Sequence, residues 1–174
     1  QGDVKIAVDA CVAASRPHHF LAVTKQGQSA IAATRGNDDA HVVLRGGKTP
    51  NYDAASVAAA CAEMDRAGLA CGLVVDASHA NSGKDPANQP AVARDVASQI
   101  AGGETRIAGM MIESHLVGGR QDLVEGQPLV YGQSITDGCI DWETSVRVLD
   151  DLAAAVRARR ERDDVPALQV IEAG

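Results

Sequence analysis

Three short apolar runs, each ending near a charged or polar side chain, constrain the fold of this chain most strongly. The runs are "HVVL", "GLVVD" and "RIAGMM", and they precede Arg45, His79 and Glu113. Arg45 and His79 lie 34 residues apart, and His79 and Glu113 are separated by the same interval of 34. Because this interval accommodates one strand and one helix, we expect three parallel strands covered by helices, which is an α/β fold.

Amphipathic helices are predicted on both sides of these strands. In "DVKIAVDACVAAS", apolar residues recur at helical spacing from Val4 onward, and Asp3 stands at the start. Asp53 is expected to cap a second helix, which ends before Gly68. Two more helices are predicted in "NQPAVARDVASQIAGG" and "WETSVRVLDDLAAAVRARR". Such helices supply the cover that a parallel sheet needs on its faces.

The rest of the chain is expected to be irregular apart from one hairpin. The segments "HHFLAVT" and "QSAIAAT" flank the turn "KQGQ" and predict an antiparallel hairpin at about residues 18–34. We expect a long polar loop at residues 116–140 and a C-terminal tail at residues 161–174. A sheet of only three parallel strands has two open edges, which is unfavourable for a free-standing domain. We therefore expect the chain to be a portion of a larger domain.

Composition argues against several classes of function. The chain has 16 Lys and Arg against 23 Asp and Glu, a formal net charge of −7, so no nucleic-acid partner is expected. No apolar run approaches the roughly 20 residues that span a bilayer, so no membrane partner is expected either. The four cysteines lie far apart without a C-x-x-C pair, and we interpret them as buried thiols of a cytoplasmic protein.

The carboxyl ends of the three strands form the predicted functional face, because active sites of parallel α/β folds lie at these ends. His79 and Glu113 follow the second and third strands, and Asp137 lies in the loop after the third. Their nitrogen and oxygen atoms suit a borderline divalent metal. In the plainer alternative, His79 hydrogen-bonds a loop and Glu113 is solvated. Asp76 is expected to pair with a basic group or to orient a ligand.

The first strand ends in a sequence that suits a phosphate group. Arg45 offers a guanidinium fork, and Lys48 adds a second positive charge. Between them, Gly46 and Gly47 are expected to turn their backbone N–H groups toward an anion. The sequence therefore predicts a metal and a phosphate site at one edge of the sheet, and Cys139 is expected to pack beside it.

Four motifs give the chain a specific family resemblance. "VLRGGKTPNY", "DASHANSGK", "MIESHLVGGRQ" and "YGQSITDGCIDWE" occur in the order and at the spacing typical of type I 3-deoxy-D-arabino-heptulosonate-7-phosphate (DAHP) synthases. The chain resembles this family from Gln1 to about Arg160. The family folds as a (β/α)8 TIM barrel, so the resemblance implies that residues 1–160 are the C-terminal portion of one such domain. They would supply its last three strands, and the hairpin would be an insertion before the sixth strand.

The resemblance also implies a reaction. It is the condensation of phosphoenolpyruvate with erythrose 4-phosphate, with release of phosphate, which opens the shikimate pathway to aromatic amino acids. The implied metal ligands are His79, Glu113 and Asp137, and the ion is Mn, Fe, Co or Zn. His79 and Asp137 are the expected catalytic residues, with Asp137 handling a proton. Arg45 is the implied ligand of the phosphoenolpyruvate phosphate.

Regulation and assembly follow from the resemblance as well. In family members inhibited by an aromatic amino acid, the hairpin forms part of the effector pocket, and Phe20, Ala22 and Ala32 fall at positions that line it. The alternative is that these residues only pack the hairpin. We expect a homo-oligomer or a complementary barrel half as partner, and no activity from the 174 residues alone. The alternative function is that of a fragment that acts only by binding.

Overall fold

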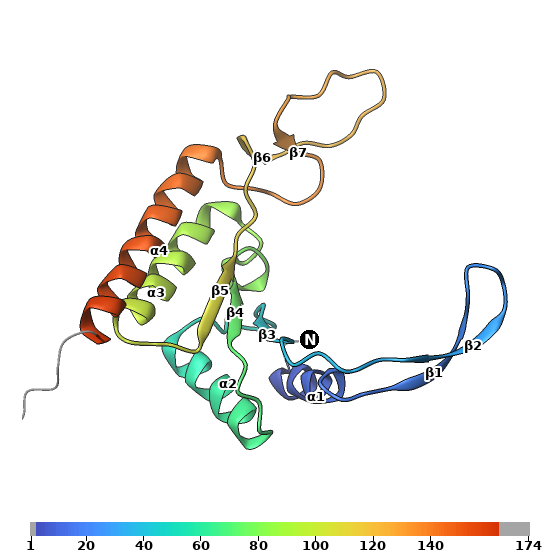
Figure 1. Cartoon of the computed structure of the whole chain (residues 1–174). Coiled ribbons are helices and arrows are strands. Elements are labelled where there is room, and N and C mark those ends of the chain that lie inside the picture. Colours follow the sequence, from blue (N-terminus) through green and yellow to red (C-terminus); the bar gives the residue numbers. More distant parts are fainter. Residues whose placement is uncertain (1–2, 164–174) are drawn as a thin grey trace, which may run out of the picture.

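Three parallel strands form the sheet that the sequence predicts. A computed structural model describes residues 3–163, and the strands lie in the order β3–β4–β5 (Figure 1). Their bounds are β3 (Val42–Leu44), β4 (Leu73–Asp76) and β5 (Ile107–Met111). Side chains on the inner face of the strands, including Leu44 and Val75, are almost fully buried. The prediction of an α/β fold with a parallel sheet is confirmed.

Within residues 3–163, four α-helices accompany the sheet, as the apolar periodicity predicts. They are α1 (Val4–Ala14), α2 (Ala54–Arg66), α3 (Gln89–Ala101) and α4 (Trp142–Asp163). Asp3 and Asp53 cap α1 and α2 by accepting backbone N–H groups of the first turn. Gly68 follows α2 with a φ of +72°, the conformation that favours glycine after a helix. The helices α3 and α4 lie side by side against one side of the sheet (Figure 1).

The main core lies where α1, α2 and α3 pack against the strands. It is aliphatic, as the low aromatic content requires, and its buried members include Val8, Val57, Met64, Leu73, Val96, Ile100 and Ile107. Of the four cysteines, only Cys11 is buried, so the expectation of four buried thiols is wrong for the other three. Cys61 and Cys71 are partly buried against this core, whereas Cys139 is partly buried elsewhere. All four are unpaired.

The predicted hairpin is present. It consists of β1 (His19–Val23) and β2 (Ser29–Ala33), which pair antiparallel with Phe20 opposite Ala32. Figure 1 shows the hairpin projecting away from the sheet. Consequently its larger apolar side chains stay exposed on both of its faces, with Phe20 at 52% and Leu21 at 83%.

The segment expected to be a loop at 116–140 contains two short strands. They are β6 (Val117–Arg120) and β7 (Gln133–Ser134), which pair in parallel. The sequence gives little signal for them, because half of β6 is glycine, a poor strand former, and because the two strands are separated along the chain. Backbone hydrogen bonds between Gly119 and Cys139 extend the contact. These pairings return the chain to the carboxyl end of β5.

The C-terminal helix runs further than the sequence indicates. Residues 161–163, expected in the tail, are the last residues of α4. The rest of that tail, residues 164–174, lies outside the described residues. Among the helices of residues 3–163, none is both long enough and apolar enough to cross a membrane.

Candidate functional site

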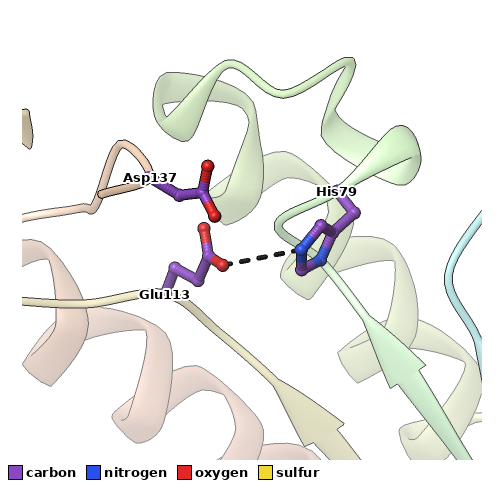
Figure 2. Close-up of side chains that lie close together, drawn as sticks. All are labelled: His79, Glu113 and Asp137. Atoms are coloured by element: carbon purple, nitrogen blue, oxygen red, sulfur yellow. Dashed lines mark ion pairs between the residues drawn. The ribbon is translucent and has the colours of Figure 1, made fainter.

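Three predicted ligand residues converge beyond the carboxyl ends of β4 and β5. His79, Glu113 and Asp137 each place one ligand atom within 4.8 Å of the others (Figure 2). The distance from His79 Nε2 to Glu113 Oε1 is 3.7 Å. Two protein ligands of one ion, each about 2.0–2.2 Å from it, lie no more than roughly 4.4 Å apart. The His79–Glu113 distance lies within this limit, and the nitrogen and oxygen donors of the three residues suit a divalent metal ion.

The orientation of His79 is fixed by a buried carboxylate. Asp76, the last residue of β4, has no exposed side-chain surface. Its Oδ1 accepts the N–H and the hydroxyl of Ser78, both at 2.8 Å, and its Oδ2 lies 2.6 Å from His79 Nδ1. Because a carboxylate only accepts, Nδ1 is the donor in this contact, and Nε2 is the ring nitrogen that faces Glu113. Asp76 thus fixes the orientation of the His79 ring.

Glu113 is held through its backbone by a side chain from a helix. Gln89, the first residue of α3 and 1% exposed, donates through Nε2 to the Glu113 carbonyl at 3.1 Å and accepts the Glu113 N–H at 2.9 Å. Burial raises the pKa of the Glu113 carboxyl, and the Asp137 and Asp76 charges add to this while His79 opposes it. A bound cation stabilises neighbouring carboxylates that repel each other in this way.

Asp137 reaches the site because β7 and the Gly119–Cys139 pairing bring its loop back. Its neighbour Cys139 is partly buried, and its Sγ lies 3.6 Å from the Asp137 carbonyl oxygen. Burial raises the pKa of the Cys139 thiol, which keeps it neutral at physiological pH. Cys139 therefore packs beside the site.

A cavity of about 580 Å³ opens next to His79. Arg45 lines it with its side chain 61% exposed, and its Nε lies 3.7 Å from Asp76 Oδ2. Lys84 lines the same cavity and has a φ of +63°, which is strained for a residue with a side chain. Lys48, the other predicted cation, is exposed and lies outside this lining.

The two glycines after Arg45 shape this cavity in a different way from that expected. The N–H of Gly46 donates to Asn51 Oδ1 at 2.7 Å, and that of Gly47 to the Thr49 carbonyl at 3.0 Å. Neither N–H is free for an anion, so that part of the phosphate prediction does not fit. Gly46 instead has a φ of +73°, and a Cβ there would lie 2.9 Å from the Asn81 nitrogen.

Asn81 bonds to the ends of both β3 and β4, a role that was not predicted. Its Nδ2 donates to the carbonyls of Leu44 at 3.0 Å and Asp76 at 2.7 Å, and its Oδ1 accepts the Asn51 N–H at 2.8 Å. One signal was available, because a run of small polar residues directly after a buried strand has to satisfy backbone groups there. Gln89 gave no comparable signal, since a glutamine at a helix start is ordinarily exposed.

The remaining predicted residues lie elsewhere. Phe20, Ala22 and Ala32 share one face of the hairpin. His115, a nearby histidine that is not one of these predicted residues, is exposed, and its Nδ1 accepts the Leu116 N–H at 2.8 Å. It therefore has a local partner rather than a place among the three converging ligands.

Residues 2–150 match the model of the DAHP synthetase I family. The chain belongs to this family. It is 55% identical over 161 residues to a phospho-2-dehydro-3-deoxyheptonate aldolase of Haemophilus influenzae, covering 92% of this chain and 44% of that protein. It is 54% identical to the Phe-sensitive phospho-2-dehydro-3-deoxyheptonate aldolase of Escherichia coli K12, and the match covers 91% of this chain and 45% of that protein.

The fold agrees with that of a solved structure. The phospho-2-dehydro-3-deoxyheptonate aldolase from Francisella tularensis SCHU S4 superposes with a TM-score of 0.86 at 46% identity, covering 92% of this chain and 47% of that one. This chain therefore spans a little under half the length of the DAHP synthetase I relatives that it matches.

Proposed function

We propose that this chain forms part of a DAHP synthase, which condenses phosphoenolpyruvate with erythrose 4-phosphate and releases phosphate. The observation that carries the proposal is the convergence of His79, Glu113 and Asp137 beside a cavity lined by Arg45, in a member of the DAHP synthetase I family. The relatives are named for an aldolase of phospho-2-dehydro-3-deoxyheptonate. The reaction would be the first step of the shikimate pathway.

Each residue of the site has a role in this proposal. His79, Glu113 and Asp137 would hold the divalent ion, Mn, Fe, Co or Zn, which when bound supplies Lewis acidity toward the aldehyde carbonyl. Arg45 would bind the phosphate of phosphoenolpyruvate and so hold this substrate in position to attack the aldehyde, an effect of positioning and electrostatics. Asp137, the most exposed of the three ligands, is the residue best placed to exchange a proton with solvent.

The wider architecture is part of the same proposal. Residues 1–160 would be the C-terminal portion of a (β/α)8 barrel, and β3, β4 and β5 would be its last three strands. The rest of the barrel, or further copies in a homo-oligomer, would cover the open edges of the sheet. The free thiols of all four cysteines suit the cytoplasm.

An aromatic amino acid is the proposed effector, since one relative is named Phe-sensitive. Phe20, Ala22 and Ala32 share a face of the projecting hairpin and would line the effector pocket once a partner covers that face.

The alternative, a fragment that acts only by binding, is disfavoured. A binding piece has no need for a buried Asp76 that orients His79, or for Gln89 that fixes Glu113. These contacts do fit a ligand set that must keep its geometry.

Kinetics of an Arg45→Ala variant test the proposal. In the active protein this change should raise KM for phosphoenolpyruvate or lower kcat, at a cost of about 2–4 kcal/mol for one charge-assisted contact. Arg94→Ala is the matched control, because Arg94 is exposed on α3 and should leave both constants unchanged. Unchanged kinetics of Arg45→Ala would contradict the assigned role.

A further inference from the structure

One oxygen atom lies between the proposed metal ligands and the proposed phosphate ligand. Asp76 Oδ2 is 2.6 Å from His79 Nδ1 and 3.7 Å from Arg45 Nε. The other oxygen, Oδ1, is taken by the N–H and hydroxyl of Ser78. The negative charge of Oδ2 is therefore shared between a histidine on one side and an arginine on the other.

His79 and Arg45 differ in how strongly they interact with the charge of Asp76. A buried carboxylate is costly unless hydrogen bonds or cations compensate it, and Asp76 is fully buried. The contact with His79 is short and that side chain is 21% exposed, whereas the contact with Arg45 is long and that side chain is 61% exposed. Arg45 is thus the partner that can leave Asp76 most readily.

We propose that Asp76 is a positioning residue that couples cation binding at His79 to anion binding at Arg45, an inference that rests on the proposed function. When His79 Nε2 gives its lone pair to a cation, Nδ1–H becomes a stronger donor and draws the charge of Oδ2 toward itself. Arg45 is then held less by Asp76 and is freer to bind a phosphate. By linkage, an anion on Arg45 strengthens cation binding to the same extent.

The proposal predicts effects of opposite sign for Asp76→Asn. An amide has a single acceptor oxygen and cannot serve both the Ser78 N–H and His79 Nδ1, so His79 is oriented poorly and Mn²⁺ affinity should fall about 10- to 100-fold. The same change removes a negative charge that competes for Arg45. In metal-free protein, phosphoenolpyruvate should therefore bind more tightly, by up to about fivefold. A purely structural loss would weaken both ligands together.

The experiment measures three affinities in the intact protein that carries this chain. Free Mn²⁺ is followed by electron paramagnetic resonance, and phosphoenolpyruvate binding by calorimetry, with EDTA and with saturating Mn²⁺. In native protein Mn²⁺ should tighten phosphoenolpyruvate binding, and Asp76→Asn should reduce this enhancement. Asp95→Asn is the control, because Asp95 lies exposed on α3 and bonds only Gln99 in the described chain. It should behave as native.

A second variant keeps the test decisive if Asp76→Asn does not fold. Arg45 is largely exposed, so Arg45→Gln is not expected to disturb folding, and it leaves Asp76 to His79 alone. Mn²⁺ should then bind at least as tightly as in native protein, and weaker binding would overturn the proposal.

The remaining outcomes distinguish a failure of the proposed coupling from a failure of the proposed function. Opposite shifts for Asp76→Asn support the coupling. Weakening of both ligands in a folded variant, or no change in either, overturns the coupling and leaves the proposed function intact. Failure of the native protein to bind Mn²⁺ and phosphoenolpyruvate overturns the proposed function, and the coupling with it.

Discussion

Gly46→Ala should be far more destabilising than the loss of an ordinary loop glycine. Its φ of +73° costs a residue with a Cβ about 1–2 kcal/mol. The new methyl would also lie 2.9 Å from the Ala80 Cβ and from the Asn81 nitrogen. That backbone cannot move aside easily, because the Asn81 side chain is bonded to both strand ends. Overpacking of this kind adds about 1–3 kcal/mol, so we expect a total of about 2–5 kcal/mol.

Gly68→Ala is the matched control for this prediction. Its φ is +72°, nearly the same as that of Gly46, but no atom lies within 4 Å of the position that the new methyl group would take. It should therefore cost only the conformational part, about 1–2 kcal/mol. Urea denaturation of both variants gives the free energies of unfolding, with unchanged m-values as the check on two-state behaviour. Equal losses for Gly46→Ala and Gly68→Ala would refute the close approach of the 45–47 turn to the 80–81 backbone.

Three further predictions follow from the site. Burial raises the pKa of Glu113, so ionisation of this carboxyl destabilises the folded state as the pH rises above the ordinary pKa of 4.5. Glu113→Gln should therefore raise the free energy of unfolding of metal-free protein at pH 7 by up to about 1 kcal/mol, while Mn²⁺ binding is lost. A destabilised variant would speak against this. Asn81→Ala should cost about 2–4 kcal/mol in urea denaturation, because it leaves buried carbonyls unpaired; a loss below about 1 kcal/mol would mean that water replaces the amide. Residues 1–174 alone should show no condensation of phosphoenolpyruvate with erythrose 4-phosphate, since the chain spans under half the length of its relatives. Activity should return only when a separately made upstream half is added. Turnover by these residues alone would refute this.

The periodic features of the fold were predictable because they depend on local spacing. The strand ends at Arg45, His79 and Glu113 recur at one interval, and parallel strands place their carboxyl ends at one edge whatever the packing details. The caps at Asp3 and Asp53 are equally local, since each depends on the few residues that follow.

The features that escaped prediction depend on partners far along the chain. Gln89 contacts Glu113 across 24 residues, and β6 and β7 pair over a glycine-rich stretch with no strand signal of its own. Gly46 shows how a correct residue can be given the wrong role. Its sequence context fits an anion-binding turn, but its N–H is used by Asn51, which only the folded chain reveals.

The two-point contact between Gln89 and Glu113 limits how this protein can vary. β5 ends at Met111, so the backbone of Glu113 lies past the last strand residue. Its N–H and carbonyl bond to the side-chain amide of Gln89, as the backbone of a strand residue would bond to a neighbouring strand. Asparagine is one methylene too short to span the same gap, and glutamate lacks the donor. A position that looks like an interchangeable helix start should therefore tolerate almost no exchange in a randomised library selected for function, whereas exposed positions on the same helix, such as Arg94, should accept many residues.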